Sequence, residues 1–428
     1  MGSTCSYLNE YSDASEIHGC IEHIEGIKSN SSSPSDTWII SLKNGTKYYN
    51  REIKKCFMKL FIDPLSFPEN ILSSDKIEKL NALNYEIKVY KYIIRPLIDY
   101  KICPFFVRYL GSSKECSFNK LILMLRAGNI DLSEDRLIKS LYYMYTGKTN
   151  RPSITDINMI PLKKSTGNIV NKCDIVNKIK YNFIINELIP NNTIAFNEYI
   201  KINYTIDEEG EGNEFSDDFW IILFQISIAC YSMSLSQLIH NDLHLGNIWI
   251  TQLDTPITVV YKIGNICYSF NTIYKIMIYD FDLSYCPLLG INIYSNINVE
   301  LIYNSDEKCN DLFKVRDIFT VINSLYNRTS EKVKLLSILS VNKNIMQMVC
   351  EDYEEWDENL DEYVKQHRIR YDNTIQSEEW MLNIINKIQS YSNTRIKIVQ
   401  NPTIINYSCN SKMFDEYGRI ILEPYKNL

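Results

Sequence analysis

Two short segments carry the side chains that could do chemistry together. In the first, His240, Asp242 and Asn247 form the pattern His-x-Asp-x-x-x-x-Asn. This pattern is typical of phosphoryl-transfer loops, where the Asp accepts a hydroxyl proton and the Asn holds a metal ion. In the second, an apolar stretch ends at Asp280, whose carboxylate offers the hard oxygen that Mg²⁺ prefers. Each segment alone is common, but together they predict His240 and Asp242 as catalytic and Asn247 and Asp280 as metal ligands.

The composition is that of an ordinary globular protein of 428 residues, enough for one large or two modest domains. Hydrophobic residues make up 45% and charged residues 23%, so the chain can bury a sizeable core. The net charge of -7 leaves no basic footprint, and we therefore expect no nucleic-acid partner. The 12 cysteines include no C-x-x-C and the 5 histidines form no ligand cluster, which predicts reduced thiols in the cytoplasm and no structural zinc.

Residue usage and the first residues bear on location. Tyr is abundant with 31 residues and Gly scarce with 14, a bias that suggests an AT-rich genome, such as that of a large DNA virus or a protist. A viral origin would place the protein in the host cytoplasm or the virion. The start Met-Gly-Ser-Thr-Cys-Ser matches the myristoylation pattern at Gly2, and Cys5 could add a palmitate, which together would give contact with a membrane.

Turn formers and hydrophobic periodicity divide the chain into an arm (1–14), a β-rich region (15–188, with a polar insertion at about 127–180) and a larger, mainly helical region (189–428). In the β-rich region we expect strands at 17–27, 37–42, 55–62, 105–109, 121–125 and 181–188, and one helix at 74–95 that ends before Pro96. In the larger region we expect helices at 193–201, 219–239, 354–368 and 377–391, and strands at 247–251, 257–263 and 273–279. The apolar stretch 219–239 contains two glutamines and four serines, which favours a buried helix over a membrane span.

Together these segments resemble the protein-kinase-like superfamily over residues 15–330, and within it the divergent serine/threonine kinases of large DNA viruses. Haspin-type kinases have a similar Asp-Leu-His-x-Gly-Asn loop, which stands here at 242–247. The resemblance implies an α+β, bilobal fold: a small β-rich N-lobe with one main helix and a larger, mostly helical C-lobe. It also implies ATP and Mg²⁺ as cofactors, with the nucleotide held in the cleft between the lobes.

The resemblance gives roles to Lys59 and Glu86. Lys59, flanked by apolar residues on a predicted strand, corresponds to the lysine that contacts the α- and β-phosphates. Glu86 on the predicted helix would be its ion-pair partner, with Glu78 on the same helix as a rival. A lysine at a sheet edge and a solvated helix glutamate are the plain structural alternatives.

The resemblance also assigns nucleotide contacts to five further positions. Gly19 and Ile21 match the end of the Gly-rich loop, which survives only in this fragment. Glu187 and Leu188 fall at the hinge, where backbone groups would bind adenine. His244 stands where many protein kinases have a lysine in this loop, so contact with the γ-phosphate must come from its imidazole or from elsewhere.

Several positions depart from the protein-kinase pattern. Asn241 replaces the Arg of His-Arg-Asp, which removes the usual partner of a phosphorylated activation loop. Asp282 replaces the Gly of Asp-Phe-Gly, and no Ala-Pro-Glu is recognisable. The buried Asp of the larger lobe is Asp311 or Asp317, a choice that the sequence leaves open.

We therefore expect an ATP- and Mg²⁺-dependent serine/threonine protein kinase, with a protein hydroxyl as acceptor. Asn241, His244 and the missing Ala-Pro-Glu leave open a small-molecule phosphotransferase of the aminoglycoside or choline kinase type, with a small alcohol as acceptor. The reduced Gly-rich loop leaves open a pseudokinase scaffold, which the presence of Lys59, Asp242, Asn247 and Asp280 opposes.

Overall fold

The computed structural model describes residues 21–26, 36–43, 47–48, 51–62, 74–117, 180–204, 214–290, 292, 309–326, 332–339, 377–415 and 418–421. Helices and strands are mixed along these residues, so the fold class is α+β. The chain divides into two compact units, Met1–Lys91 with Arg108–Ile189 and Tyr92–Val107 with Pro190–Leu428. Several predicted features lie outside the described residues: Gly2, Cys5, Gly19, the insertion up to residue 179, the strand 121–125 and the helix 354–368.

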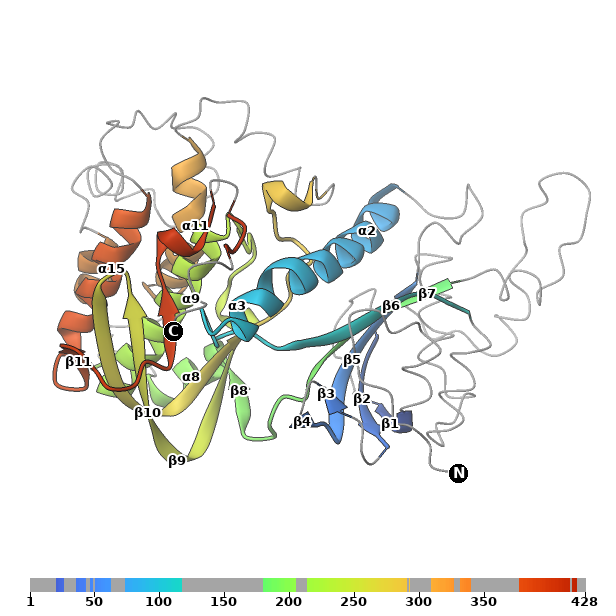
Figure 1. Cartoon of the computed structure of the whole chain (residues 1–428), viewed down its shortest axis with the longest axis horizontal. Helices are drawn as coiled ribbons and strands as arrows, with labels where there is room; N and C mark the ends of the chain where they lie inside the picture. Colours follow the sequence, from blue (N-terminus) through green and yellow to red (C-terminus); the bar gives the residue numbers. More distant parts are fainter. Residues whose placement is uncertain are drawn as a thin grey trace, which may run out of the picture. The chain divides into compact units, whose positions relative to one another are not determined.

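The first unit contains a five-stranded antiparallel sheet with the order β1-β2-β5-β7-β6 (Figure 1). Its strands are β1 (Ile21–Gly26), β2 (Asp36–Leu42), β5 (Lys55–Ile62), β7 (Lys180–Glu187) and β6 (Tyr109–Ser117). A separate pair is formed by β3 (Lys47–Tyr48) and β4 (Arg51–Glu52). The predictions for β2, β5 and β7 are confirmed almost to the residue, because each is a short, mainly apolar run of strand length.

Helix α2 (Ser74–Val89) lies on the face of this sheet to which Lys59 points. Residues opposite each other in antiparallel strands share a face, and Lys59 on β5 is opposite Ile184 on β7. Asn182 has the same parity as Ile184 on β7, and its Nδ2 donates to Oδ1 of Asn84 on α2 at 3.0 Å. The opposite face of β5 is apolar, so alternation directs Lys59 toward the helix.

The prediction that this helix ends before Pro96 is wrong. After Val89 the chain passes through a π-helical turn, η2 (Tyr90–Ile94), into α3 (Arg95–Asp99). Pro96 lies in the first turn of α3, but the backbone before it is already helical, since Ile94 has φ -66° and ψ -46°. The chain therefore stays helical up to and through Pro96, with the π turn directly before α3.

In the second unit, α9 (Asp217–Leu235) is the most buried helix among the described residues, since every side chain from Phe219 to Ser234 is buried. The Oγ of Ser216 caps its start by accepting from the N–H of Phe219 at 3.3 Å. By length and composition α9 alone among the described helices could cross a membrane, but its burial is that of a core helix. The other helices of this unit are α8 (Phe196–Asn203), α11 (Cys309–Tyr326), α12 (Lys332–Leu339) and α15 (Ser377–Tyr391).

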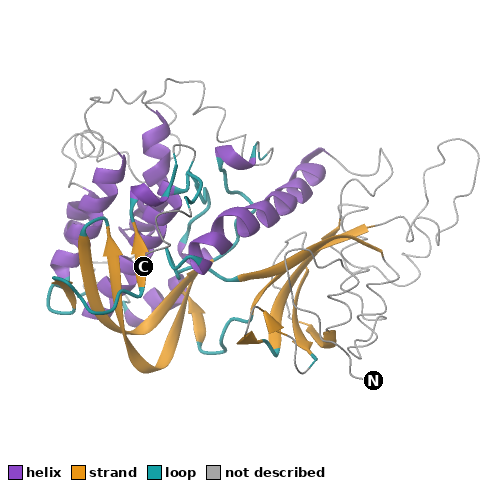
Figure 2. Ribbon diagram, in the orientation of Figure 1, coloured by secondary structure: helices purple, strands orange, loops and turns teal. Residues whose placement is uncertain are grey.

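A second sheet of five strands makes this unit richer in β-structure than the mostly helical lobe we expected. Figure 2 shows β9 (Ile248–Ile263) and β10 (Ile266–Ile278) as a long, bent ribbon. Joined to this ribbon are β11 (Ile396–Val399), β12 (Tyr407–Cys409) and β8 (Thr193–Ala195). The predicted strands 247–251 and 257–263 are one strand, and the turn after it contains Gly264 at φ 57°, the left-handed value that glycine takes readily.

The segment Tyr92–Val107 belongs to the second unit, although we had assigned it to the N-lobe. The strand predicted at 105–109 begins only at Tyr109, as β6, and before it single backbone bonds and a bridge between Phe106 and Ile278 join the segment to β10. Ile278 donates to the carbonyl of Phe105 at 3.0 Å, and Val107 donates to the carbonyl of Ile278 at 3.1 Å. The hydroxyl of Tyr261 on β9 also donates to the carbonyl of Ile102. These bonds tie the segment to the second sheet.

Candidate active site

In the first unit, the ammonium of Lys59 lies 2.8 Å from Oε2 of Glu86. Glu86 is 2% exposed and Lys59 15% exposed, so the pair is largely removed from water. Of the two candidate glutamates on α2, Glu86 and Glu78, the partner of Lys59 is therefore Glu86. Buried charges persist when they are paired, and such a pair holds the lysine in one orientation.

The other predicted nucleotide contacts of the first unit lie at strand ends. Ile21 begins β1 and is buried. Glu187 ends β7 and exchanges two bonds with Arg108: its N–H donates to the Arg108 carbonyl at 2.8 Å, and its Oε1 accepts from the Arg108 N–H at 3.2 Å. The N–H of Glu187 is therefore engaged. Leu188 follows the strand, and its N–H has no hydrogen-bond partner among the described residues.

In the second unit, Asp317 on α11 fixes the start of the loop that carries Asp242. Its carboxylate accepts from the backbone N–H of His240 at 2.8 Å and of Asn241 at 3.0 Å. These bonds hold Asn241 at φ 65°, in the left-handed region that Asn tolerates better than most residues. Burial raises the pKa of Asp317, while His240 and the two backbone bonds oppose that rise. Of the two candidates, Asp317 is thus the buried Asp.

His240 joins this loop to the end of β10. Its ring is fully buried, Nε2 lies 2.9 Å from the carbonyl oxygen of Tyr279, and the ring centroid is 4.8 Å from that of Phe281. A bond to a carbonyl requires the hydrogen on Nε2. Through these contacts His240 links the loop to the residues that directly follow β10.

Asn247 and Asp242 are bonded to each other across the loop. Nδ2 of Asn247 donates to the backbone carbonyl of Asp242 at 2.9 Å and approaches its Oδ2 at 3.4 Å. The Oδ1 of Asn247 makes no hydrogen bond within the described part of the chain. Asn247 is buried, whereas the side chain of Asp242 is 39% exposed.

Asp280 is brought to this loop by Tyr279. The Tyr279 N–H donates to the Asn247 carbonyl at 3.3 Å, its hydroxyl donates to the Gly246 carbonyl at 3.4 Å, and its ring lies 4.1 Å from that of Trp249. Asp280 follows directly at φ 69°, a left-handed conformation that is uncommon for a residue other than glycine. Such conformations cluster at functional sites.

The chain after Asp280 is tied down by side-chain amides. Nδ2 of Asn241 donates to the carbonyl of Leu283 at 3.2 Å. Nδ2 of Asn292 donates to the carbonyls of Asp282 at 2.9 Å and Ser284 at 2.8 Å. Sequence reasoning missed Asn292, because a single Asn ten residues after the motif carries no signal.

The donor set fits Mg²⁺. Asp280 and Asn247 offer a carboxylate and an amide oxygen, and Mg²⁺ is usually bound by one or two protein oxygens together with phosphates and waters. No group of three or more His, Cys, Asp or Glu side chains that could hold a metal occurs among the described residues.

His244 lies on the surface of the same loop. Its side chain is 53% exposed, Nδ1 accepts from the Gly246 N–H at 3.0 Å, and Nε2 lies 3.8 Å from Oδ2 of Asp242. The second unit thus brings together His240, Asp242, His244, Asn247 and Asp280.

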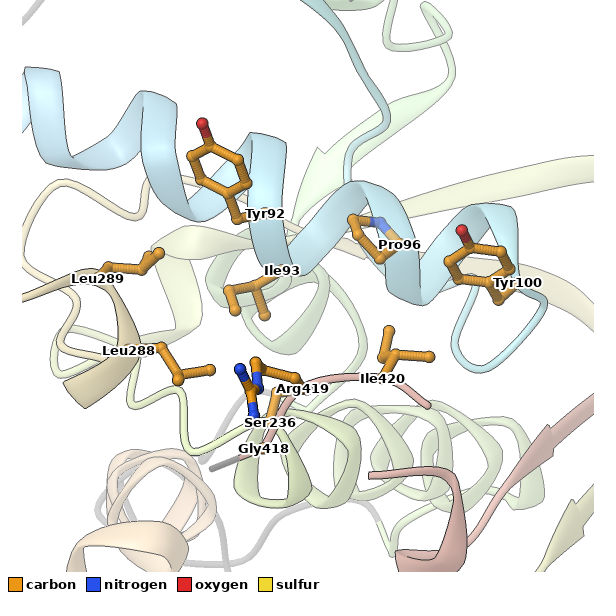
Figure 3. Close-up of a pocket in the computed structure, with 10 residues that line it drawn as sticks. All are labelled: Tyr92, Ile93, Pro96, Tyr100, Ser236, Leu288, Leu289, Gly418, Arg419 and Ile420. Carbon is orange, nitrogen blue, oxygen red and sulfur yellow. The ribbon is translucent and has the colours of Figure 1, made fainter. Parts of the chain in front are cut away.

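A cavity of about 590 Å³ in the second unit is a separate feature (Figure 3). Its walls are mainly apolar and include Ile93, Pro96, Leu288 and Ile420. Arg419 reaches it while its Nε is bound to Asp415 at 2.6 Å. None of the predicted site residues lines this cavity, and no carboxylate is among the described residues that do.

Comparison with known proteins adds no relative. A scan of the chain against models of protein families finds no match, and no curated protein matches it.

Proposed function

We propose that this chain is an ATP- and Mg²⁺-dependent phosphotransferase of the protein-kinase type, which transfers the γ-phosphate of ATP to a serine or threonine hydroxyl of a protein. The observation that carries the proposal is the ion pair between Lys59 and Glu86, at 2.8 Å. The chemistry requires this pair, because a lysine that holds phosphates must be fixed by a carboxylate. The bond joins β5 to α2, the two elements on which the sequence predicted these residues.

We propose further that the two units are the lobes of a bilobal kinase fold. The first unit has the five-stranded antiparallel sheet and one main helix of an N-lobe. The second has a buried central helix, a loop with Asp242 and Asn247, and a following strand that ends just before Asp280, as a C-lobe does. Its large sheet departs from that pattern.

In the proposed reaction, the side chains of this chain bind, orient and accept a proton. Lys59 holds the α- and β-phosphates, and Glu86 orients Lys59. A magnesium ion held by Asp280 and Asn247 would neutralise charge on the phosphates. Asp242 orients the acceptor hydroxyl and takes its proton as the oxygen–phosphorus bond forms and the bond to ADP breaks. Asp317 and His240 keep Asp242 in place through the loop backbone.

A small-molecule acceptor is the second candidate, and Asn241 favours it. Protein kinases regulated by a phosphorylated loop keep an arginine there, whereas the Asn241 amide is bound to the carbonyl of Leu283. The position that holds an arginine in those kinases therefore holds a neutral amide here, bound to the backbone. Regulation by a phosphorylated loop is therefore not expected, and one of the marks of a protein kinase is absent.

Transfer from γ-labelled ATP separates these possibilities. The purified chain is incubated with Mg²⁺ and casein or myelin basic protein in one set of reactions, and with choline or aminoglycosides in another. Label on serine or threonine is the expected result. Label only on a small molecule would replace the protein acceptor by the second candidate. ATP binding without transfer to any acceptor would contradict the proposed activity and support a scaffold.

A further inference from the structure

The cavity of about 590 Å³ in the second unit has the size and the lining of a small-molecule site. Its described walls come from the turn η2, from α3, from the end of α9, from the short turn η5 (Pro287–Leu289) and from residues 418–420, all of which belong to the second unit. Small-molecule sites typically have volumes of about 300–1,000 Å³, mainly apolar walls and a few polar groups that orient the ligand. The cavity meets this description, with Arg419 as its charged group.

The apolar walls favour a ligand with an apolar body. Ile93 lies opposite Leu288 and Ile420 (Figure 3). Tyr92 and Tyr100 also line the cavity and are 56% and 49% exposed, so it is open to solvent beside them. A ligand can therefore enter, and burial of its apolar surface would supply most of the affinity.

Arg419 is held in place by Asp415. Oδ1 of Asp415 accepts from the backbone N–H of Arg419 at 2.8 Å, and Oδ2 accepts from Nε at 2.6 Å. The N–H of Asp415 donates in turn to the carbonyl of Arg419 at 2.9 Å. Most N–H donors of a guanidinium are on its two terminal nitrogens, so Arg419 can bind Asp415 through Nε and a second acceptor as well.

Gly418 fixes this segment against the end of α9. Its φ is 80°, and a Cβ here would lie 2.7 Å from the carbonyl carbon and 2.9 Å from the carbonyl oxygen of Ser236. Its N–H donates to the carbonyl of Asp415 at 2.9 Å. Glycine is therefore required here both by the backbone conformation and by the close approach. The backbone that carries Arg419 is thus set without a ligand.

The charges at the cavity favour an anion with a single charge. No carboxylate is among the described residues that line it, so none of these residues would attract a cation. A carboxylate matches the fork of the Arg419 guanidinium, and its charge-assisted bonds are stronger than those of a neutral acceptor. Asp415 already offsets the charge of Arg419, so a doubly charged phosphate would be repelled more than a carboxylate.

We propose that this cavity is a binding site for a small carboxylic acid with an apolar body. The carboxylate binds Arg419, and the body lies among Ile93, Leu288 and Ile420. The site is distinct from the loop that carries Asp242, because none of the residues assigned to phosphoryl transfer lines it. Binding involves no covalent step and does not depend on the proposed phosphotransferase activity.

Three naphthalene derivatives of similar shape test the ligand class on the full chain. They are 2-naphthoate, 2-naphthalenemethanol and 2-naphthylmethylamine, which are anionic, neutral and cationic at neutral pH. We expect one molecule of 2-naphthoate to bind per chain with a Kd of about 1 mM or tighter, from the usual affinity per ligand atom. The alcohol should bind about tenfold more weakly, because it lacks the charge-assisted bonds, and the amine more weakly still. Ligand-observed NMR titrations give the three Kd values.

Two variants separate the carboxylate contact from the apolar one. Arg419→Gln should weaken binding of 2-naphthoate about tenfold, to the affinity of the alcohol, and leave binding of the alcohol unchanged. Ile420→Trp fills the cavity and should abolish binding of both ligands. If the urea midpoint shows that Ile420→Trp does not fold, Leu289→Trp fills the cavity from η5 instead and should have the same effect.

Matched controls make the same changes away from the cavity. Lys412→Gln removes one positive charge from an exposed residue that does not line it. Ile404→Trp adds the same ring at a residue that is 67% exposed and does not line it either. Both variants should bind 2-naphthoate as the wild type does.

Four results would overturn the proposal. They are no binding of 2-naphthoate at ten times the expected Kd, equal or tighter binding of the alcohol or the amine, wild-type affinity for 2-naphthoate in Arg419→Gln, and wild-type affinity in the cavity-filling variant. Self-association of the wild type that Ile420→Trp abolishes, measured by sedimentation, would instead assign the cavity to a second copy of the chain.

Discussion

Replacing Glu86 by Gln removes the charge that faces Lys59 and leaves a side chain of nearly the same shape. At 2.8 Å, the attraction between the two charges is about 6 kcal/mol at an effective dielectric constant of about 20, before desolvation offsets most of it. Gln keeps an oxygen that can accept from the ammonium. The loss is then the difference between a charge-assisted and a neutral hydrogen bond, about 1–2 kcal/mol of unfolding free energy. Glu86→Ala, which leaves Lys59 without its carboxylate, should cost about 3–5 kcal/mol.

The effect of Glu86→Gln on turnover should exceed its effect on stability. A lysine no longer held by its carboxylate drifts from the phosphates, and a displacement of about 1 Å can cost about 10²-fold in rate. The assay is a cycle of wild type, Lys59→Met, Glu86→Gln and the double variant, measured by kcat/KM and by the urea midpoint. Because the two side chains act as a pair, the double variant should be little worse than Lys59→Met alone.

Glu78→Gln is the matched control, since Glu78 is on the same helix and was the rival partner in the sequence. It should leave both measurements unchanged. Additive losses in the cycle would refute the reasoning, as would a larger loss in Glu78→Gln than in Glu86→Gln.

Three further predictions concern the second unit. Asp280→Asn should weaken binding of ATP in the presence of Mg²⁺ at least about tenfold, or 1.4 kcal/mol, and leave metal-free ATP binding unchanged by calorimetry; equal effects with and without Mg²⁺ would contradict the metal role. Because burial raises the pKa of Asp317 above 3.8, its contribution to unfolding free energy should be greatest below about pH 4 and fall as pH rises through the raised pKa. The urea midpoint of the wild type should fall with rising pH more than that of Asp317→Asn, and parallel pH profiles of the two midpoints would contradict this. Burial raises the pKa of Cys103 to about 12, so iodoacetamide should label it in urea but not in the folded chain, as peptide mass spectrometry would show; native labelling would contradict its burial.

Elements set by local periodicity could be predicted from the sequence. A short apolar run broken only by Lys59 defined β5, and the prediction for 377–391 matches α15 to the residue. The ion pair between Lys59 and Glu86 was predicted through the resemblance to the protein-kinase-like superfamily, with Glu78 left open as a rival partner.

Elements set by long-range pairing were harder to predict. The short strands β11 and β12 pair only with β10 and β9, so their own residues do not predict them. The turn between β9 and β10 was missed although Gly264 precedes Asn265, a pair typical of hairpins. Asp317 could not be separated from Asp311 in the sequence, because the choice depends on which helix face meets the loop at His240.

In the proposed function, Asp242 takes the proton of an acceptor hydroxyl during phosphoryl transfer. The most direct test is transfer of label from γ-labelled ATP by wild type and by Asp242→Asn, with ATP affinity measured on the same samples. Asn preserves the shape of Asp242 and the carbonyl that Asn247 contacts, so binding should persist. We expect transfer by the wild type, and loss of transfer with retained ATP binding in Asp242→Asn. Equal transfer by both proteins would contradict it.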